Sequence, residues 1–175
     1  IALTVWTFRF YVDNGAQRGR AMACATILLT SFEVYRAGMA CRVDMLLTFF
    51  MVGALFTLYN YWKRGMHGFP VAPVLMMSGA MLSKGPVGVL LPCAVAGLFM
   101  LVRGVYFWRV FSKLLGIAIA SCVIPMIWYV GAYARGGEEF LRLALEENFG
   151  RLTGTMSYAS HENPVWYNFQ TVLLG

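Results

Sequence analysis

Long apolar runs separated by short polar turns dominate this sequence. The clearest runs cover residues 45–62, 87–102 and 114–133. A transmembrane helix needs about 20 consecutive apolar residues, because the hydrocarbon core of a bilayer is about 30 Å thick. The run at 45–62 comes close to that length. The pattern therefore predicts helices that are covered by lipid, and it argues against a soluble fold.

The composition supports membrane embedding. Of the 175 residues, 59% are hydrophobic and 13% are charged, whereas about 25% of the residues of a soluble domain are charged. So short a chain cannot bury this much apolar surface within itself, and lipid must cover part of it. The net charge of +6 does not indicate nucleic-acid binding, because the basic residues flank apolar runs and form no stripe. Basic flanks are typical of membrane proteins.

We expect an all-α, polytopic transmembrane helical bundle with about six to seven spans. Residues 1–175 are interpreted as a single transmembrane domain fragment of a longer protein, because the chain opens inside an apolar run without an initiator Met. The predicted segments are residues 1–12, 21–35, 45–62, 71–82, 87–102, 114–133 and a last one from about Val165. The segments 71–82 and 87–102 are short and punctuated by proline. Shortened, broken helices are tolerated where they face protein or a water-filled cavity.

The polar connections indicate an orientation. Alternating them along the predicted spans places these basic residues on one side: Arg18, Arg20, Lys63, Arg64, Arg103, Arg109 and Lys113. Seven of the eight acids fall on the other side, five of them in the interval 133–165. Short basic loops remain in the cytoplasm, so we expect 133–165 to be an extracytoplasmic loop. Within it, residues 138–148 have the apolar pattern of an amphipathic helix on the membrane surface.

Arg42 and Asp44 form the first candidate site, at the start of the run 45–62. A charge near the apolar layer is costly and usually faces a cavity, a partner or the interface. Two interpretations stay open. The pair could fix the hairpin, or it could line the rim of a site for a phosphate-bearing substrate, because the planar guanidinium of Arg donates two bonds at once.

Lys84 is the second candidate, within Ser83-Lys84-Gly85-Pro86 between two apolar runs. Gly85 lets the backbone turn, and Pro86 can begin the next helix because its missing N–H costs nothing there. A lysine beside the free N–H groups of a helix N-terminus can bind an anion. Alternatively, Lys84 extends to the interface at a helix break.

The interval 133–165 supplies the remaining candidates, Arg151 and His161. A lone histidine is more often structural than functional, and no HExxH or comparable spacing supports a metal site here. The four cysteines are scattered without a CxxC, so we expect neither a disulfide nor a metal site built on them.

Three stretches in this order resemble one family: FEVYRAGMACRVDMLLTFF, then LSKGPVGVLLP, then a loop with EENFGR and SHENPVWY. They are similar to the bacterial GT-C glycosyltransferases, which include the aminoarabinose transferase that modifies lipid A and relatives of the dolichyl-phosphate-mannose protein mannosyltransferases. The resemblance covers most of the chain. It implies a multi-pass enzyme of the bacterial inner membrane. Such an enzyme transfers a sugar from a polyprenyl-phosphate donor to a lipid (lipid A-like) or protein acceptor on the extracytoplasmic side.

The resemblance also implies roles for residues. The substrate- and phosphate-binding residues would be Arg42, Asp44, Lys84, Arg151 and His161. The catalytic acid is expected in an extracytoplasmic loop upstream of Ile1. Asn148 stands where some members carry His. No cofactor is assigned, and use of a divalent metal is left open.

Three alternatives remain beside this interpretation. A transporter or channel fragment would explain broken helices and buried charges, but the inverted repeats common in transporters are not found here. A lipid-linked oligosaccharide ligase or flippase is the second alternative, and a purely structural membrane protein is the third.

Overall fold

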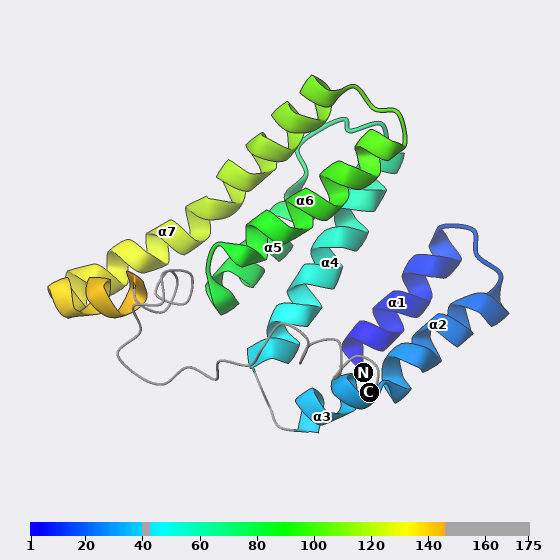
Figure 1. The fold of residues 1–175 in the computed structure, drawn as a ribbon, viewed down its shortest axis with the longest axis horizontal. Helices are drawn as coiled ribbons and strands as arrows, with labels where there is room; N and C mark the ends of the chain where they lie inside the picture. The colour runs from blue at the N-terminus through cyan, green and yellow to red at the C-terminus, as the bar shows by residue number, and fades with distance from the viewer. Residues whose placement is uncertain (40–42, 146–175) are drawn as a thin grey trace, which may run out of the picture. The chain divides into compact units, whose positions relative to one another are not determined.

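The computed structural model describes residues 1–39 and 43–145. These residues form α-helices and no strand (Figure 1), so the all-α prediction is confirmed for the described chain. The helices belong to two compact units, one that includes Ile1–Met45 and one that spans Leu46–His161.

The first unit contains three helices: α1, Ala2–Asp13; α2, Arg18–Thr30; and α3, Phe32–Met39. Helices α1 and α2 pack against each other, and small residues, Ala21 and Ala25, are buried on α2. The segment predicted at 21–35 is divided at Ser31, whose extended backbone (φ −59°, ψ 124°) ends α2. Neither resulting helix is long enough to span a bilayer by itself.

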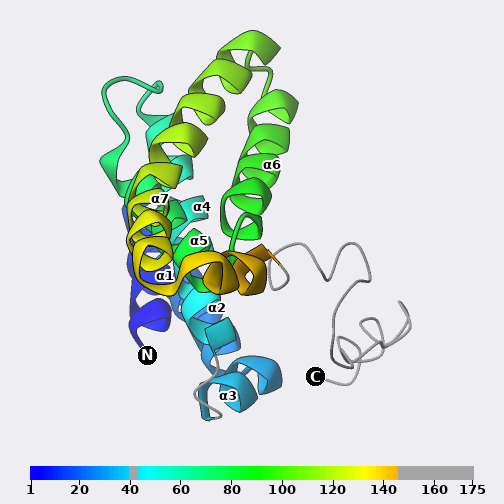
Figure 2. The same cartoon turned by 90° about the vertical axis from the view of Figure 1, so that its left-hand side faces the viewer.

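The second unit is built from four helices that run in alternating directions (Figure 1). They are α4, Val43–Lys63, which belongs to this unit from Leu46 onward; α5, Val71–Lys84; α6, Val87–Val102; and α7, Phe107–Leu145. Helices α5, α6 and α7 pack against one another, and Figure 2 shows α6 beside the first half of α7. All four helices contribute to one core, which includes Ala54, Leu58, Met77, Val89, Ala96, Met100, Val110, Leu114 and Ile117.

Small residues set the helix spacing in the second unit. A Cβ added at Gly88 of α6 would overlap the backbone of Ala80 in α5, and one added at Gly79 would meet the ring of Phe50 in α4. Close backbone approach at small residues is a common way for helices to pack in membranes, where lipid supplies no hydrophobic drive for helix association.

Helix boundaries follow the sequence closely in the middle of the chain and depart from it at α7. Helix α6 covers the predicted run 87–102, whereas α7 begins at Phe107 instead of residue 114 and continues past Tyr133. The basic residues Arg109 and Lys113, which fall between the predicted segments 87–102 and 114–133, lie inside α7 instead. Their long side chains are exposed at the surface of the helix.

Two helices are long and apolar enough to cross a membrane, Val43–Lys63 and Phe107–Phe140. Within their most apolar 18-residue stretches, 17% and 28% of the residues are buried in the protein. A core helix of a soluble protein would be mostly buried, so these helices support membrane association. The apolar helices α5 and α6 are shorter, and the count of six to seven spans stays a prediction.

Candidate functional site

Lys84 lies at the turn between α5 and α6. It is the last residue of α5, and its side chain is exposed. Gly85 follows with φ 72° and ψ −154°, a conformation that is essentially restricted to glycine. The Gly85 N–H donates to the Met81 carbonyl at 2.8 Å and completes the end of α5. The predicted turn is therefore present, and glycine is required for it.

The start of α6 is already hydrogen-bonded. The Gly88 N–H donates to the Gly85 carbonyl at 3.1 Å, and those of Val89 and Leu90 donate to the Pro86 carbonyl at 3.0 Å. These groups are therefore less available to an anion than the sequence suggested. What this turn offers to an anion is the ammonium group of Lys84, at the C-terminal end of α5. A cation there also interacts favourably with the helix dipole.

Asp44 lies in the first turn of α4 and is half-buried. A carboxylate at this position interacts favourably with the positive end of the helix dipole. This interaction gives Asp44 a structural role, the stabilisation of α4. Asp44 belongs to the first unit and Lys84 to the second. Arg42, Arg151 and His161, the other predicted binding residues, lie outside the described residues, as does Asn148.

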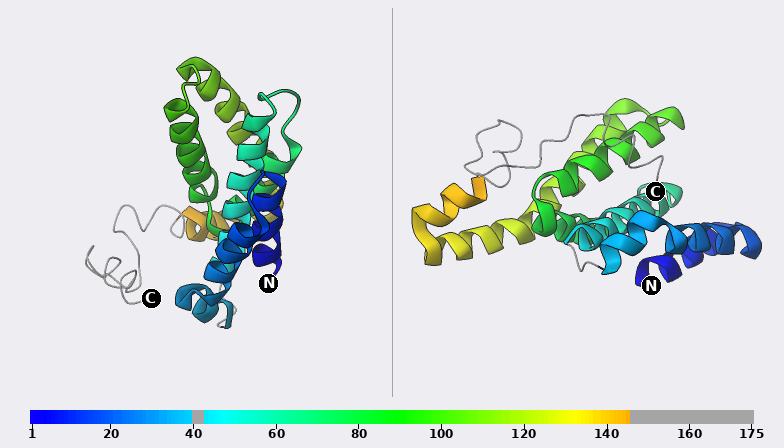
Figure 3. Two further views of the ribbon diagram at one scale, coloured as in Figure 1. Left: turned by 90° about the vertical axis from the view of Figure 1, so that its right-hand side faces the viewer. Right: turned by 60° about the horizontal axis from the view of Figure 1, so that its bottom comes forward.

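Helix α7 changes direction at Gly137, whose φ of 61° and ψ of −150° are non-helical. Figure 3 (right) shows the last turns of α7, in orange, at a steep angle to the rest of the helix. Phe140 beyond the kink packs against Trp128 and Tyr129, with ring centroids 6.0 and 6.3 Å apart. The helix predicted from residue 138 is present as far as Leu145, and Glu138 and Glu139 at its start are exposed.

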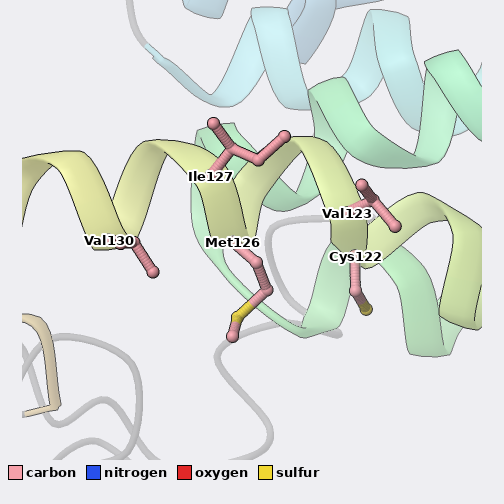
Figure 4. Close-up of a pocket in the computed structure, with 5 residues that line it drawn as sticks. All are labelled: Cys122, Val123, Met126, Ile127 and Val130. Atoms are coloured by element: carbon pink, nitrogen blue, oxygen red, sulfur yellow. The ribbon is translucent and has the colours of Figure 1, made fainter.

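An open apolar depression of about 450 Å³ lies along α7. It is lined by Cys122, Val123, Met126, Ile127 and Val130 (Figure 4). Figure 4 shows Cys122, Met126 and Val130 on one side of the helix, as their four-residue spacing requires. This surface was not among the predicted sites, although the apolar residues at positions 122, 126 and 130 have the four-residue spacing of one helix face.

Metal ligands do not gather anywhere in the described chain: no group of three or more His, Cys, Asp and Glu residues there could hold a metal ion. Cys24, Cys93 and Cys122 are free thiols. The described residues therefore give the candidate site one exposed cation, at a glycine-dependent turn, and an apolar surface on a neighbouring helix.

The chain is distantly similar to a known protein. An uncharacterized protein of Aquifex aeolicus (strain VF5) is 25% identical over 155 residues. The match covers 86% of this chain but 29% of the relative, so the chain corresponds to less than a third of that protein's length. No family model matches the sequence. No solved structure matches it either.

Proposed function

We propose that this chain forms part of a membrane-embedded glycosyltransferase of GT-C type. The enzyme would transfer a sugar from a polyprenyl-phosphate donor to a lipid or protein acceptor on the extracytoplasmic side of the bacterial inner membrane. The three sequence stretches described above support this proposal, and so do the exposed apolar helices. The depth that Lys84 would have in the membrane, at the end of the short helix α5, is its strongest support.

That depth follows from helix lengths. Helices α4 and α5 meet at the loop 64–70 and run in opposite directions from it. The 21 residues of α4 extend about 31 Å and the 14 residues of α5 about 21 Å. If α4 spans the apolar layer, Lys84 at the far end of α5 lies roughly 10 Å inside the opposite boundary. A cation at such a depth is costly and is usually kept for function.

The chemistry requires a cation near the leaving group. An acceptor oxygen or nitrogen attacks the anomeric carbon of the sugar, and the bond from that carbon to the phosphate oxygen breaks. The electron pair leaves with polyprenyl phosphate, and the acceptor gives its proton to a base. Lys84, with Arg42 and Arg151 as further candidates, would stabilise the charge that develops on the phosphate, which is often the largest contribution to catalysis.

The apolar depression on α7 has the character that the other part of the donor needs. A polyprenyl chain is entirely apolar, and the five lining side chains of this depression are aliphatic or sulfur-containing. Binding energy from a chain remote from the reacting carbon can be used to orient the sugar. We propose this surface as the place where the chain begins to bind.

The test measures sugar transfer by the full-length protein in nanodiscs, from a polyprenyl-phosphate sugar to a crude lipid or peptide fraction. Lys84→Ala should lower the turnover number about a hundredfold, the typical effect of losing one group that stabilises transition-state charge. Lys63→Ala is the matched control, because Lys63 also ends its helix but at the other end of the unit. Parallel reactions with EDTA test the use of a divalent metal.

Two results would contradict the proposal. Wild-type turnover in folded Lys84→Ala would remove this lysine from the site. Absence of transfer from any donor by folded wild-type protein would favour the transporter alternative, and flux assays in liposomes would then be the appropriate measurement.

A further inference from the structure

Positive charge gathers at the end of the second unit that is distant from Lys84. The end of α4, the end of α6 and the start of α7 meet there (Figures 1 and 2). These elements carry Lys63, Arg64, Arg103, Arg109 and Lys113. Among the described residues 46–145 the acids are Glu138 and Glu139, roughly 35 Å from Lys113 along α7. That separation is several Debye lengths at physiological ionic strength, so the carboxylates do not neutralise this end.

A recess of about 230 Å³ opens at this basic end. Its lining includes Tyr61 of α4, Phe69 of the α4–α5 loop, and Ser112, Lys113 and Gly116 of α7. Sites for drug-sized molecules occupy roughly 300–1,000 Å³, so this one suits a smaller group. The Lys113 ammonium supplies a positive charge suited to an anion, whereas the Ser112 hydroxyl already donates to the Arg109 carbonyl at 3.3 Å.

Hydrogen bonds hold the wall of the recess in place. The Tyr61 hydroxyl donates to the Met66 carbonyl at 3.0 Å, and Arg109 Nη2 donates to the Gly65 carbonyl at 3.1 Å. Together they tie the α4–α5 loop to the two helices beside it. The recess is therefore preformed, which lowers the entropy cost of filling it.

Exposed aromatic residues lie in the recess lining, as Phe69 does, and at the start of α7, as Tyr106 and Trp108 do. Phe69 and Tyr106 are each 71% exposed, and Trp108 is 61% exposed. The Arg103 guanidinium lies 5.5 Å from the centre of the Trp62 ring. Aromatic and basic side chains together mark the headgroup level of a bilayer. The recess would therefore open toward lipid headgroups.

We propose that this recess binds the headgroup of an anionic membrane phospholipid. The Lys113 ammonium contacts the phosphate, and Phe69 lies against the upper part of an acyl chain. This inference rests on the membrane embedding that the proposed function includes, but it does not depend on sugar transfer. A soluble phosphate compound would use the Lys113 ammonium but not the exposed ring of Phe69, so the lipid explains more of the site.

The test is lipid retention by the full-length protein, measured by native mass spectrometry after titration with phosphatidylglycerol or phosphatidylcholine in an uncharged detergent. Wild-type protein should retain phosphatidylglycerol preferentially. Lys113→Gln should weaken its binding about fivefold, the effect of one basic residue near an anionic lipid surface. Gly116→Leu should weaken it similarly without a change of charge, because open space at Gly116 lets the new side chain fill the recess.

Lys63→Gln is the matched control, because it removes one charge from the same end but outside the recess lining. It should change phosphatidylglycerol binding less than twofold, and thermal unfolding should verify the fold of each variant. Equal loss in Lys63→Gln and Lys113→Gln, equal retention of the two lipids, or displacement by inorganic phosphate would overturn the proposal. The assay contains no sugar donor, so its outcome is independent of the glycosyltransferase test.

Discussion

The hydroxyl of Ser78 in α5 donates a 2.8 Å hydrogen bond to the backbone carbonyl of Ser121 in α7. Both residues are buried, with exposed fractions of 2% and 0%. The residue four positions after Ser121 is Pro125, which has no N–H to donate to that carbonyl. The Ser78 hydroxyl therefore replaces the missing intrahelical bond. Prolines inside transmembrane helices are commonly tolerated in this way.

Removing this bond should destabilise the second unit. Ser78→Ala leaves the Ser121 carbonyl buried without its donor, and we expect a loss of about 1 kcal/mol in the free energy of unfolding. Ser83→Ala is the matched control, because the Ser83 hydroxyl bonds to Gly79 of its own helix. Unfolding by a denaturing detergent at equilibrium measures both.

The coupling to Pro125 can be tested by a double-mutant cycle. Pro125→Ala restores an N–H to α7, so the Ser121 carbonyl regains an intrahelical partner. In this background Ser78→Ala should cost less than it does in the wild type. Strictly additive effects of the two substitutions would show that the hydroxyl does not compensate for the proline.

Gly88→Ala should separate α5 from α6. Its methyl group would overlap the backbone of Ala80, which cannot move aside as a flexible side chain could. Forced overpacking of this kind costs about 1–3 kcal/mol of stability. Gly131→Ala in α7 adds the same methyl group where nothing lies within 4 Å, and its melting temperature should stay at or above that of the wild type. A comparable loss in both variants would contradict the close approach at Gly88.

Gly137→Ala should straighten α7. The backbone at Gly137 is in a region that alanine rarely adopts, and the strain of keeping it there is about 1–3 kcal/mol. A helical alanine would instead extend α7 past the kink. Spin labels at the exposed positions Ile119 and Arg142 should then lie about 35 Å apart along a straight helix, a longer distance than in the wild type. An unchanged distance distribution would mean that packing of Phe140 maintains the kink alone.

Arg109→Ala should loosen the α4–α5 loop. The variant loses the bond to the Gly65 carbonyl, so residues 64–70 should exchange their amide hydrogens faster. Because the arginine is exposed, we expect global stability to change by less than about 0.5 kcal/mol. Hydrogen–deuterium exchange in nanodiscs separates this local effect from unfolding. Unaltered exchange in the loop would show that the Tyr61 hydroxyl bond suffices to hold it.

The boundaries of α6 were predictable because local signals surround it. Pro86 stands immediately before the helix, the cation Arg103 follows it, and the residues between are almost all apolar. The glycine turn at Lys84-Gly85-Pro86 was predictable for the same reason. The start of α7 was not predictable in this way. The charged residues among the aromatic side chains before residue 114 are also typical of a loop between two helices. In the structure Arg109 and Lys113 are exposed at the surface of the helix, which continues beneath them.

The sequence by itself determined that the described chain is helical and apolar, and that a glycine turn separates α5 from α6, because these properties depend on residues close together in the chain. Only the tertiary structure decided which group replaces the hydrogen bond that Pro125 removes from α7. The partner of the Ser121 carbonyl lies 43 residues away, and the walls of the basic recess come from α4, a loop and α7. Such contacts depend on how the helices pack in three dimensions, so they cannot be predicted from the residue pattern within one segment.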